Sequence, residues 1–121
     1  MGWGKTSAKD VASEHLRYYR TSIQSKKRCD DAFNYRFPQN TVCLLANQFK
    51  GPCHGDWGAP VARKIQNEGK DIWIQLGMIS IGDEDCKWSD YVPAVGMDTT
   101  KYCDFYKTTI GREICQRLQE D

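Results

Sequence analysis

The sequence predicts an all-β domain stapled by disulfides, and three observations support this class. The 121 residues suit a single domain. Several short segments rich in β-branched and aromatic residues alternate with turns that contain Gly or Pro, a pattern typical of barrels and sandwiches. Six cysteines in so short a chain indicate three disulfides and an oxidising compartment.

The first half of the chain predicts one strand and one short helix. After a polar loop over residues 5–14, the β-branched and aromatic composition of residues 16–24 predicts a strand. Ser25 is a suitable N-cap for a helix over residues 26–33. A turn at residues 38–40 should end this region.

The second half predicts mainly strands. The turn at residues 67–70 contains Gly69 and should join strands at residues 61–65 and 72–81 into a hairpin. The remaining elements that we expect are a short buried strand at 41–46, a tight Gly-rich loop at 51–58, a strand at 92–97 and the start of a C-terminal helix at 100–106.

Composition and charge exclude several function classes. The formal net charge is +1, so nothing favours nucleic acid or an anionic membrane as a partner. No apolar run approaches the roughly 18 residues that a membrane span needs. The sequence contains no C-x-x-C pair, which argues against a zinc knuckle. The acidic residues 83–85 are best explained as a solvated loop. We therefore expect no metal and no cofactor.

The stretch at residues 53–60, C-H-G-D-W-G-A-P, carries the strongest functional signal. It resembles the C-x-G-D-S-G-G-P loop of chymotrypsin-like and trypsin-like serine proteases, with Trp57 in place of the nucleophilic serine. G-W-G at residues 2–4, W-I-Q-L-G-M-I-S-I-G at 73–82 and P-A-V at 93–95 resemble further landmarks of that family. The resemblance therefore runs along nearly the whole chain.

The resemblance implies a particular architecture. Residues 1–121 would form a partial trypsin-like domain, the second six-stranded Greek-key barrel with a truncated first strand, a short internal helix and a C-terminal helix. It implies disulfides between Cys29 and Cys43 and between Cys53 and Cys86. Cys103 and Cys115 lie outside the commonest family pattern and are expected to pair with each other.

The same resemblance implies a site without catalysis. An indole at Trp57 has no oxygen to attack a carbonyl, and the barrel that carries the family's catalytic His and Asp has no counterpart here. His15 lacks the family context and is expected to be a surface histidine. Only the backbone N–H groups of Gly55 and Trp57, the family's oxyanion donors, do not depend on the lost side chain.

The specificity pocket is also altered relative to the family. Gly51 falls at the pocket floor, where trypsin-like members keep an Asp, so no charge is available for a Lys or Arg side chain. Ala94 replaces a Gly and should narrow the pocket. Ser80 and Gly82 lie on the strand that lines the substrate cleft in the family, and Ser80 is expected to be a structural hydroxyl. The peptide-binding strand should persist while selectivity does not.

Three further residues carry open expectations. In the family the carboxylate at Asp56 pairs with an N-terminal ammonium that this chain lacks, so Asp56 should either point outward or receive a partner from another chain. Trp88 and Tyr91 are better explained by core or rim packing than by an exposed contact patch.

Three functions remain in competition. The first is a catalytically inactive protease homologue that binds a protein or peptide in the remnant substrate cleft. The second is a fragment of a full-length secreted serine endopeptidase, since residues 1–20 contain no signal peptide although the cysteines indicate secretion. The third is an active endopeptidase completed by a chain that supplies the first barrel, which Trp57 disfavours.

Overall fold

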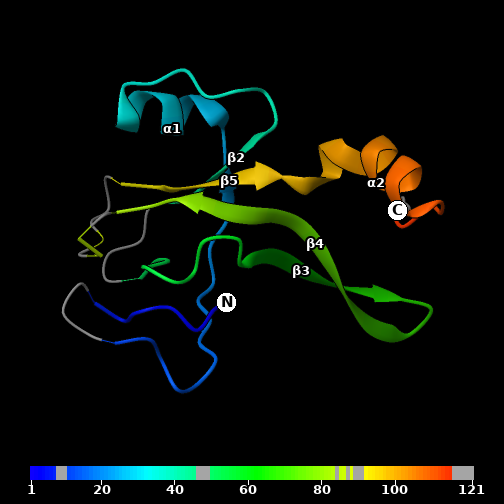
Figure 1. Ribbon diagram of the computed structural model, residues 1–121, viewed down its shortest axis with the longest axis horizontal. Helices are drawn as coiled ribbons and strands as arrows, with labels where there is room; N and C mark the ends of the chain where they lie inside the picture. Colours follow the sequence, from blue (N-terminus) through cyan, green and yellow to red (C-terminus); the bar gives the residue numbers. More distant parts are fainter. Residues whose placement is uncertain (8–10, 46–49, 84, 87, 89–91, 116–121) are drawn as a thin grey trace.

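The computed structural model describes residues 1–121 except 8–10, 46–49, 84, 87, 89–91 and 116–121. One antiparallel sheet with the strand order β1-β2-β5-β4-β3 forms the body of the molecule (Figure 1). The strands are β1 (Ile23–Gln24), β2 (Thr41–Leu44), β3 (Pro60–Asn67), β4 (Lys70–Ile81) and β5 (Ala94–Asp98). The predicted all-β class is confirmed.

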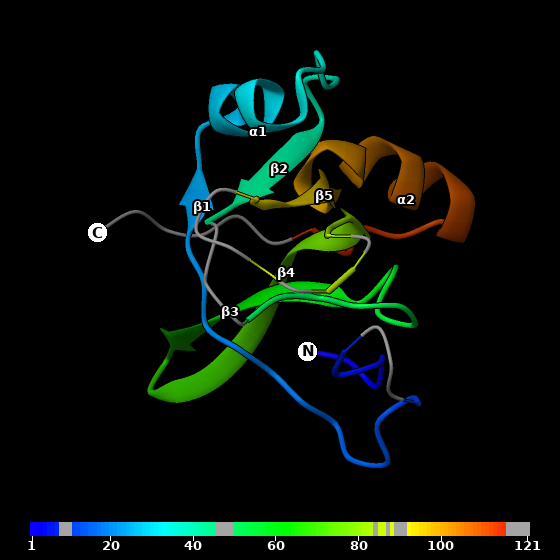
Figure 2. The same ribbon diagram turned by 90° about the vertical axis from the view of Figure 1, so that its left-hand side faces the viewer.

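Two short helices accompany the sheet. They are α1 (Lys26–Phe33) and α2 (Cys103–Ile110), the latter preceded by the 3₁₀ turn η1 (Thr99–Tyr102). Figures 1 and 2 place α1 above the sheet, α2 beside it beyond the end of β5, and the N-terminal segment below it. The helix predicted at residues 26–33 is confirmed. The C-terminal helix begins one residue earlier than predicted, as a 3₁₀ turn, and continues to Ile110.

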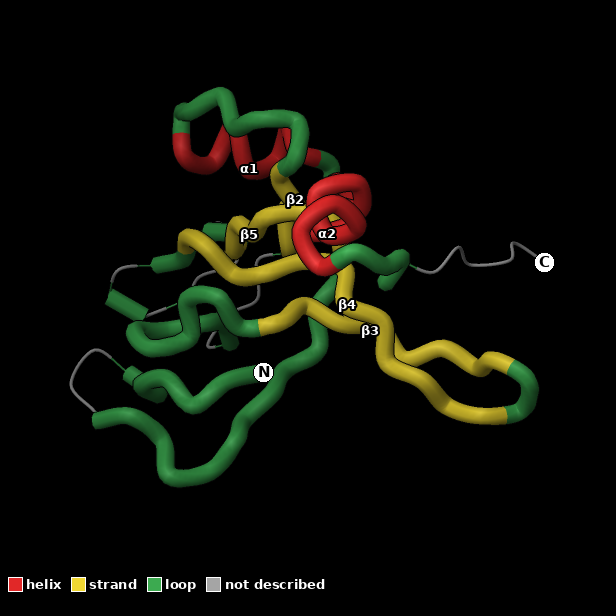
Figure 3. The backbone as a smooth tube through the Cα atoms, turned by 45° about the vertical axis from the view of Figure 1, so that its right-hand side comes forward, coloured by secondary structure: helices red, strands yellow, loops and turns green. Residues whose placement is uncertain are grey.

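The β3–β4 hairpin projects beyond the rest of the sheet (Figure 3). Its strands pair from Pro60 opposite Met78 to Asn67 opposite Lys70. Glu68 and Gly69 both have positive φ, 51° and 77°, as a two-residue hairpin loop requires. The predicted turn is therefore confirmed, and the strands extend to it directly on both sides.

The strand predicted over residues 16–24 is shorter than expected. Only Ile23 and Gln24 pair with β2, and Arg17 instead forms an isolated bridge with Gly2. This segment lies at one end of the sheet, so it has at most one neighbouring strand to supply hydrogen bonds. β-Propensity alone does not create a ladder where no partner strand is present.

Two other strand boundaries differ from prediction. β2 ends at Leu44, and Ala46 lies outside the described residues. β5 begins at Ala94 rather than Val92, since the intervening Pro93 has no N–H to donate to a ladder.

Buried side chains form two adjoining clusters, and the disulfides reinforce them. One cluster contains Val42, Leu44, Ile79, Trp88 and Ala94. The other contains Cys29, Phe37, Cys43 and Val95. Disulfides join Cys29 to Cys43 and Cys53 to Cys86, as the resemblance implied, and the expected third pair joins Cys103 to Cys115. No helix in the described part of the chain is long and apolar enough to cross a membrane.

Candidate functional site

A tight loop after Gly51 carries Trp57 and is held against β4. The Asp56 N–H donates to the Cys53 carbonyl over 2.9 Å, and Gly55 supplies the positive φ of 98° that the turn needs. The Gly58 N–H then donates to the Ile79 carbonyl over 2.8 Å. The loop is thus positioned by main-chain bonds, whatever side chain stands at position 57.

Asp56 finds its partners within its own chain. Its two carboxylate oxygens accept hydrogen bonds from the N–H groups of Gly4, over 2.8 Å, and Cys53, over 3.0 Å. A Cβ at Gly2 or Gly4 would lie 1.9 or 2.5 Å from the Asp56 carboxyl, so only glycine fits this close approach. Both expectations for Asp56 are therefore wrong, because the N-terminal segment folds back onto the carboxylate.

The backbone donors of the loop remain available. The His54 carbonyl accepts from the Lys5 N–H over 2.8 Å. The Gly55 N–H belongs to the same trans peptide as this carbonyl, so it points in the opposite direction, away from Lys5. Within the described part of the chain, neither this N–H nor that of Trp57 has an acceptor. Their role as oxyanion donors stays a prediction.

The Trp57 indole reaches from the loop to the end of β4. Its ring meets the His54 imidazole edge-on, with centroids 6.2 Å apart. On its far side, Cη2 would lie 3.3 Å from a Cβ placed on Gly82. The side chain is 43% exposed. Trp57 therefore lies over the backbone that follows β4, where the resemblance places an extended substrate.

The indole of Trp88 fills the predicted specificity pocket. Trp88 is only 4% exposed. A Cβ added to Gly51 would lie 2.1 Å from its Cε2, and one added to Gly82 would lie 2.7 Å from its Cη2. Ala94 belongs to the same buried cluster. Three of the four residues predicted for the pocket, Gly51, Gly82 and Ala94, thus lie around one side chain of the chain itself, and Ser80 does not.

This occupant was not placed in the pocket by sequence reasoning. Core or rim packing was expected for Trp88, and burial agrees with that, whereas Tyr91 lies outside the described residues. The disulfide between Cys53 and Cys86 could have indicated this contact. Trp88 lies two residues after Cys86, and Gly51 lies two residues before Cys53. An aromatic side chain tethered that closely can reach space that two glycines leave open.

Ser80 lies apart from this pocket. Its side chain is exposed and borders a hollow of about 570 Å³ beside Ile81. Phe33, Tyr35 and Phe37 from the end of α1 and the following loop form the aromatic side of the hollow. The Tyr35 and Phe37 rings pack edge to face with centroids 4.9 Å apart.

The His15 main chain and the acidic loop at residues 83–85 form hydrogen bonds within their own segments. His15 is exposed, and its N–H bonds to the Ser13 hydroxyl in the N-terminal segment. Asp83 accepts from the Asp85 N–H over 3.1 Å, so its carboxylate closes a turn, while Glu84 lies outside the described residues. In the described ranges, no three His, Cys, Asp or Glu side chains gather closely enough to hold a metal ion.

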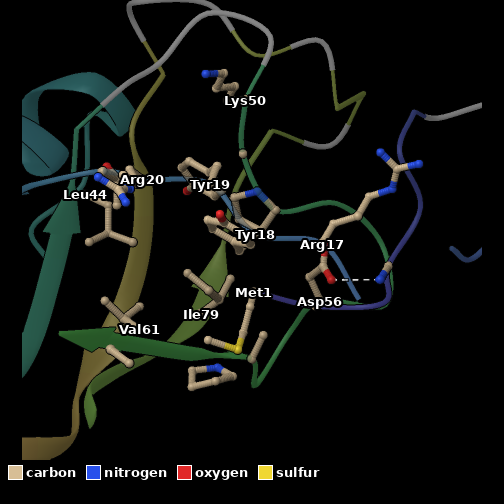
Figure 4. A pocket seen from close by; sticks show the side chains of 18 of the residues that line it. Met1, Arg17, Tyr18, Tyr19, Arg20, Leu44, Lys50, Asp56, Val61 and Ile79 are labelled. Carbon is tan, nitrogen blue, oxygen red and sulfur yellow. Dashed lines mark hydrogen bonds between the residues drawn. The ribbon is translucent and has the colours of Figure 1, made fainter. Parts of the chain in front are cut away.

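Among the described residues near the loop, Tyr19 is the one whose pKa is shifted strongly. Burial, followed by the negative charge of Asp56, raises the pKa of Tyr19 to about 12. Figure 4 shows Tyr19 and Asp56 bordering the same open groove. The folded phenol therefore keeps its proton further into the alkaline range than an exposed tyrosine does.

Comparisons with known proteins identify relatives along most of the chain. The model of the family described as Trypsin matches residues 1–106. Kallikrein-8 of Homo sapiens is 28% identical over 111 residues, which cover 91% of this chain and 39% of the relative. Trypsin I-P1 of Gallus gallus is 30% identical over 112 residues, covering 91% of this chain and 41% of the relative. The chain thus spans about two fifths of the length of these curated relatives.

Proposed function

We propose a binding role without catalysis for this chain, which belongs to the trypsin family. One observation carries the proposal: an indole, Trp57, stands where the resemblance expects the nucleophile, and the buried indole of Trp88 fills the space beside Gly82. Acyl transfer in this family needs a hydroxyl nucleophile that a base deprotonates. Loss of the nucleophile alone costs on the order of 10⁶ in kcat in subtilisin.

The remaining features suit recognition of an extended peptide. The unpartnered N–H groups of Gly55 and Trp57 can donate hydrogen bonds to a carbonyl or carboxylate oxygen of a ligand. The aromatic hollow beside Ser80 and Ile81 offers about 570 Å³ for an apolar side chain, a volume typical of ligand sites. Because Trp88 occupies the neighbouring pocket, a ligand side chain has no access there.

A serine-directed fluorophosphonate probe tests the absence of catalysis. The native chain should remain unlabelled and should not cleave fluorogenic peptides, while a trypsin-family protease that keeps its serine labels fully under the same conditions. Stoichiometric labelling of the native chain would overturn the proposal, because it would reveal a nucleophile that Trp57 does not supply.

Binding is tested with a dye-labelled, extended peptide that carries a single Leu side chain. Tyr35→Ala removes one wall of the aromatic hollow and should weaken binding in fluorescence anisotropy by about tenfold, on the order of 1.4 kcal/mol. Phe105→Ala is the matched control, because Phe105 on α2 is about as exposed as Tyr35 and borders neither the aromatic hollow nor the open groove beside Tyr19. Equal affinities for both variants would contradict the assignment.

A second candidate is that this sequence acts as part of a longer trypsin-family protein. The observation that favours it is coverage, since the matches span 39% and 41% of two relatives. Intact mass of the native protein, with and without reduction, separates the cases. A species at 13.9 kDa without free thiols supports an independent binding module. A heavier species that contains this sequence supports the longer protein.

The three disulfides also bear on location. They require an oxidising compartment to form and persist. We therefore propose a secreted or extracellular protein, and thiol alkylation of material isolated directly from its source tests this. Free thiols at Cys53 and Cys86 would contradict it.

A further inference from the structure

The loop after α1 is attached to that helix through both main-chain groups of Phe37. The Phe37 N–H donates to the Asp30 carboxylate over 2.9 Å. The Phe37 carbonyl accepts from the Lys26 ammonium over 2.8 Å. The same ammonium donates to the other carboxylate oxygen of Asp30 over 2.6 Å. Lys26, Asp30 and Phe37 therefore form a closed ring of hydrogen bonds, which we call the α1 clamp.

A second ion pair on the same helix shows what distinguishes the α1 clamp. Lys27 and Asp31 have the same spacing of four residues, and their charged atoms lie 2.7 Å apart. Their side chains are 82% and 66% exposed, whereas those of Lys26 and Asp30 are each only 21% exposed. The Lys26 side chain, followed by the Phe37 N–H, lowers the pKa of the Asp30 carboxyl, so it stays charged at neutral pH. Only the less exposed pair is thus bonded to the loop.

Phe37 links the α1 clamp to the aromatic hollow. The Phe37 side chain is buried, and the rings of Phe33 and Tyr35 meet it edge-on with centroids 5.8 Å and 4.9 Å away. Tyr35 itself is 61% exposed. Because much of Tyr35 is open to solvent, its orientation depends on the ring of Phe37 on which it packs.

The two charged residues lie outside the hollow that they help to shape. Phe33, Tyr35 and Phe37 line the hollow, whereas Lys26 and Asp30 do not. A side chain bound in the hollow would therefore touch the rings and not the charges. Any effect of Lys26 or Asp30 on such a ligand has to act through the loop.

We propose that Lys26 and Asp30 are positioning residues for the aromatic hollow, because they hold Phe37 where its ring supports Tyr35. This inference rests on the proposed function, in which the hollow receives an apolar side chain. A loop that is ordered before binding loses less conformational freedom when the ligand arrives. Without the α1 clamp the ligand has to order this loop itself, so its affinity falls. All members of the α1 clamp lie within residues 26–37, so the arrangement is local to α1 and the loop after it.

Fluorescence anisotropy with the dye-labelled Leu peptide tests the inference on the native, disulfide-intact chain. Asp30→Ala should weaken binding by about fivefold, and the matched control Asp31→Ala by less than about twofold, since its exposed ion pair is not bonded to Phe37. In the Tyr35→Ala background, Asp30→Ala should change affinity by less than about twofold, because the wall through which it acts is gone. Equal losses in the two backgrounds would overturn the inference.

Amide hydrogen exchange, measured residue by residue by NMR, tests the α1 clamp without a ligand. The Phe37 amide should exchange at least about tenfold faster in Asp30→Ala than in the native chain. Asp30→Asn should recover most of the protection, because its amide oxygen can accept the same hydrogen bond. Unchanged protection in β2 and β5 would show that both variants are folded. An unchanged Phe37 amide in a folded Asp30→Ala variant would overturn the inference.

The two measurements separate this inference from the proposed function. If the native chain binds the peptide and Tyr35→Ala weakens binding but Asp30→Ala does not, only the inference fails. If the native chain binds no peptide, the proposed function fails and the ligand role of Asp30 fails with it. The exchange of the Phe37 amide would then still decide whether Asp30 holds the loop.

Discussion

At the scale of single residues, two glycines and one tryptophan define the centre of the site. Gly51 and Gly82 leave room for the Trp88 ring, and any side chain at either position would overlap it. Trp57 then closes the space above Gly82. The space beside the two glycines is therefore filled by a side chain of the chain itself.

Trp88→Ala should open this pocket at a cost of about 3–5 kcal/mol in unfolding free energy, since a large buried ring is removed. Added indole should refill the cavity and restore several degrees of Tm. Benzamidine should not, because Gly51 provides no carboxylate for its cation. Trp73→Ala is the control: Trp73 is 64% exposed, so its loss should cost less than about 0.5 kcal/mol and give no response to indole. An unresponsive Trp88→Ala variant that is folded would contradict an indole-shaped pocket.

Gly51→Ala should destabilise the chain by about 1–3 kcal/mol, because its Cβ would lie 2.1 Å from the Trp88 ring. In the Trp88→Ala background the same substitution should cost much less, since the opposing ring is gone. Urea denaturation of the four proteins in this cycle measures the coupling. Additive effects would mean that the two residues do not meet.

Tyr19 makes stability depend on alkaline pH. The unfolded phenol has a pKa of about 10 and the folded one about 12, so the unfolded chain loses its proton first. Stability is unaffected below pH 10 and falls as pH rises from 10 to 12, by on the order of 3 kcal/mol in total. Tyr19→Phe should lack this loss in urea denaturation at each pH. Asp56→Asn should reduce the shift only in part, since burial is its larger cause. Parallel curves for the native chain and Tyr19→Phe would disprove the assignment.

At the scale of elements, local sequence patterns correctly predicted the helix and the hairpin, which depend on interactions between residues close in sequence. The α1 helix follows Ser25, and the β3–β4 hairpin closes at Glu68 and Gly69, whose positive φ values suit a two-residue turn. The strand predicted at residues 16–24 failed over most of its length because its ladder depends on a neighbour, which composition cannot report. β-Propensity thus located the strands, but it did not locate strand ends that depend on pairing with a neighbouring strand.

The disulfides that involve α1 and α2 should contribute different amounts to the free energy of unfolding. Cys29–Cys43 and Cys103–Cys115 close similar loops, with separations of 14 and 12, so chain entropy gives each about 3 kcal/mol. Cys29 and Cys43 are 0% and 1% exposed, whereas α2 contains no buried residue. Replacing the first pair by Ala should therefore cost roughly 1–2 kcal/mol more, from lost packing. Urea denaturation compares the two variants, and equal costs would show that packing around Cys29 contributes nothing.

At the scale of the whole molecule, motifs predicted the family and the altered loop, but not the arrangement between distant segments. Trp57, Gly51, Gly82 and Ala94 were identified because each replaces or retains a landmark residue. The filling of the pocket by Trp88 and the capture of Asp56 by Gly4 depend on contacts between residues far apart in the chain.

The burial of Trp88 gives the chain a built-in optical signal. Of the four tryptophans, Trp3, Trp57 and Trp73 are 52%, 43% and 64% exposed, while Trp88 is 4% exposed. Water relaxes the excited state of an exposed indole and shifts its emission to longer wavelength, so Trp88 should supply the short-wavelength, iodide-resistant part of the spectrum. Any ligand or condition that moves the Trp88 ring out of the pocket should shift the emission of this component alone to longer wavelength. The state of the pocket can thus be followed by light in the unmodified protein.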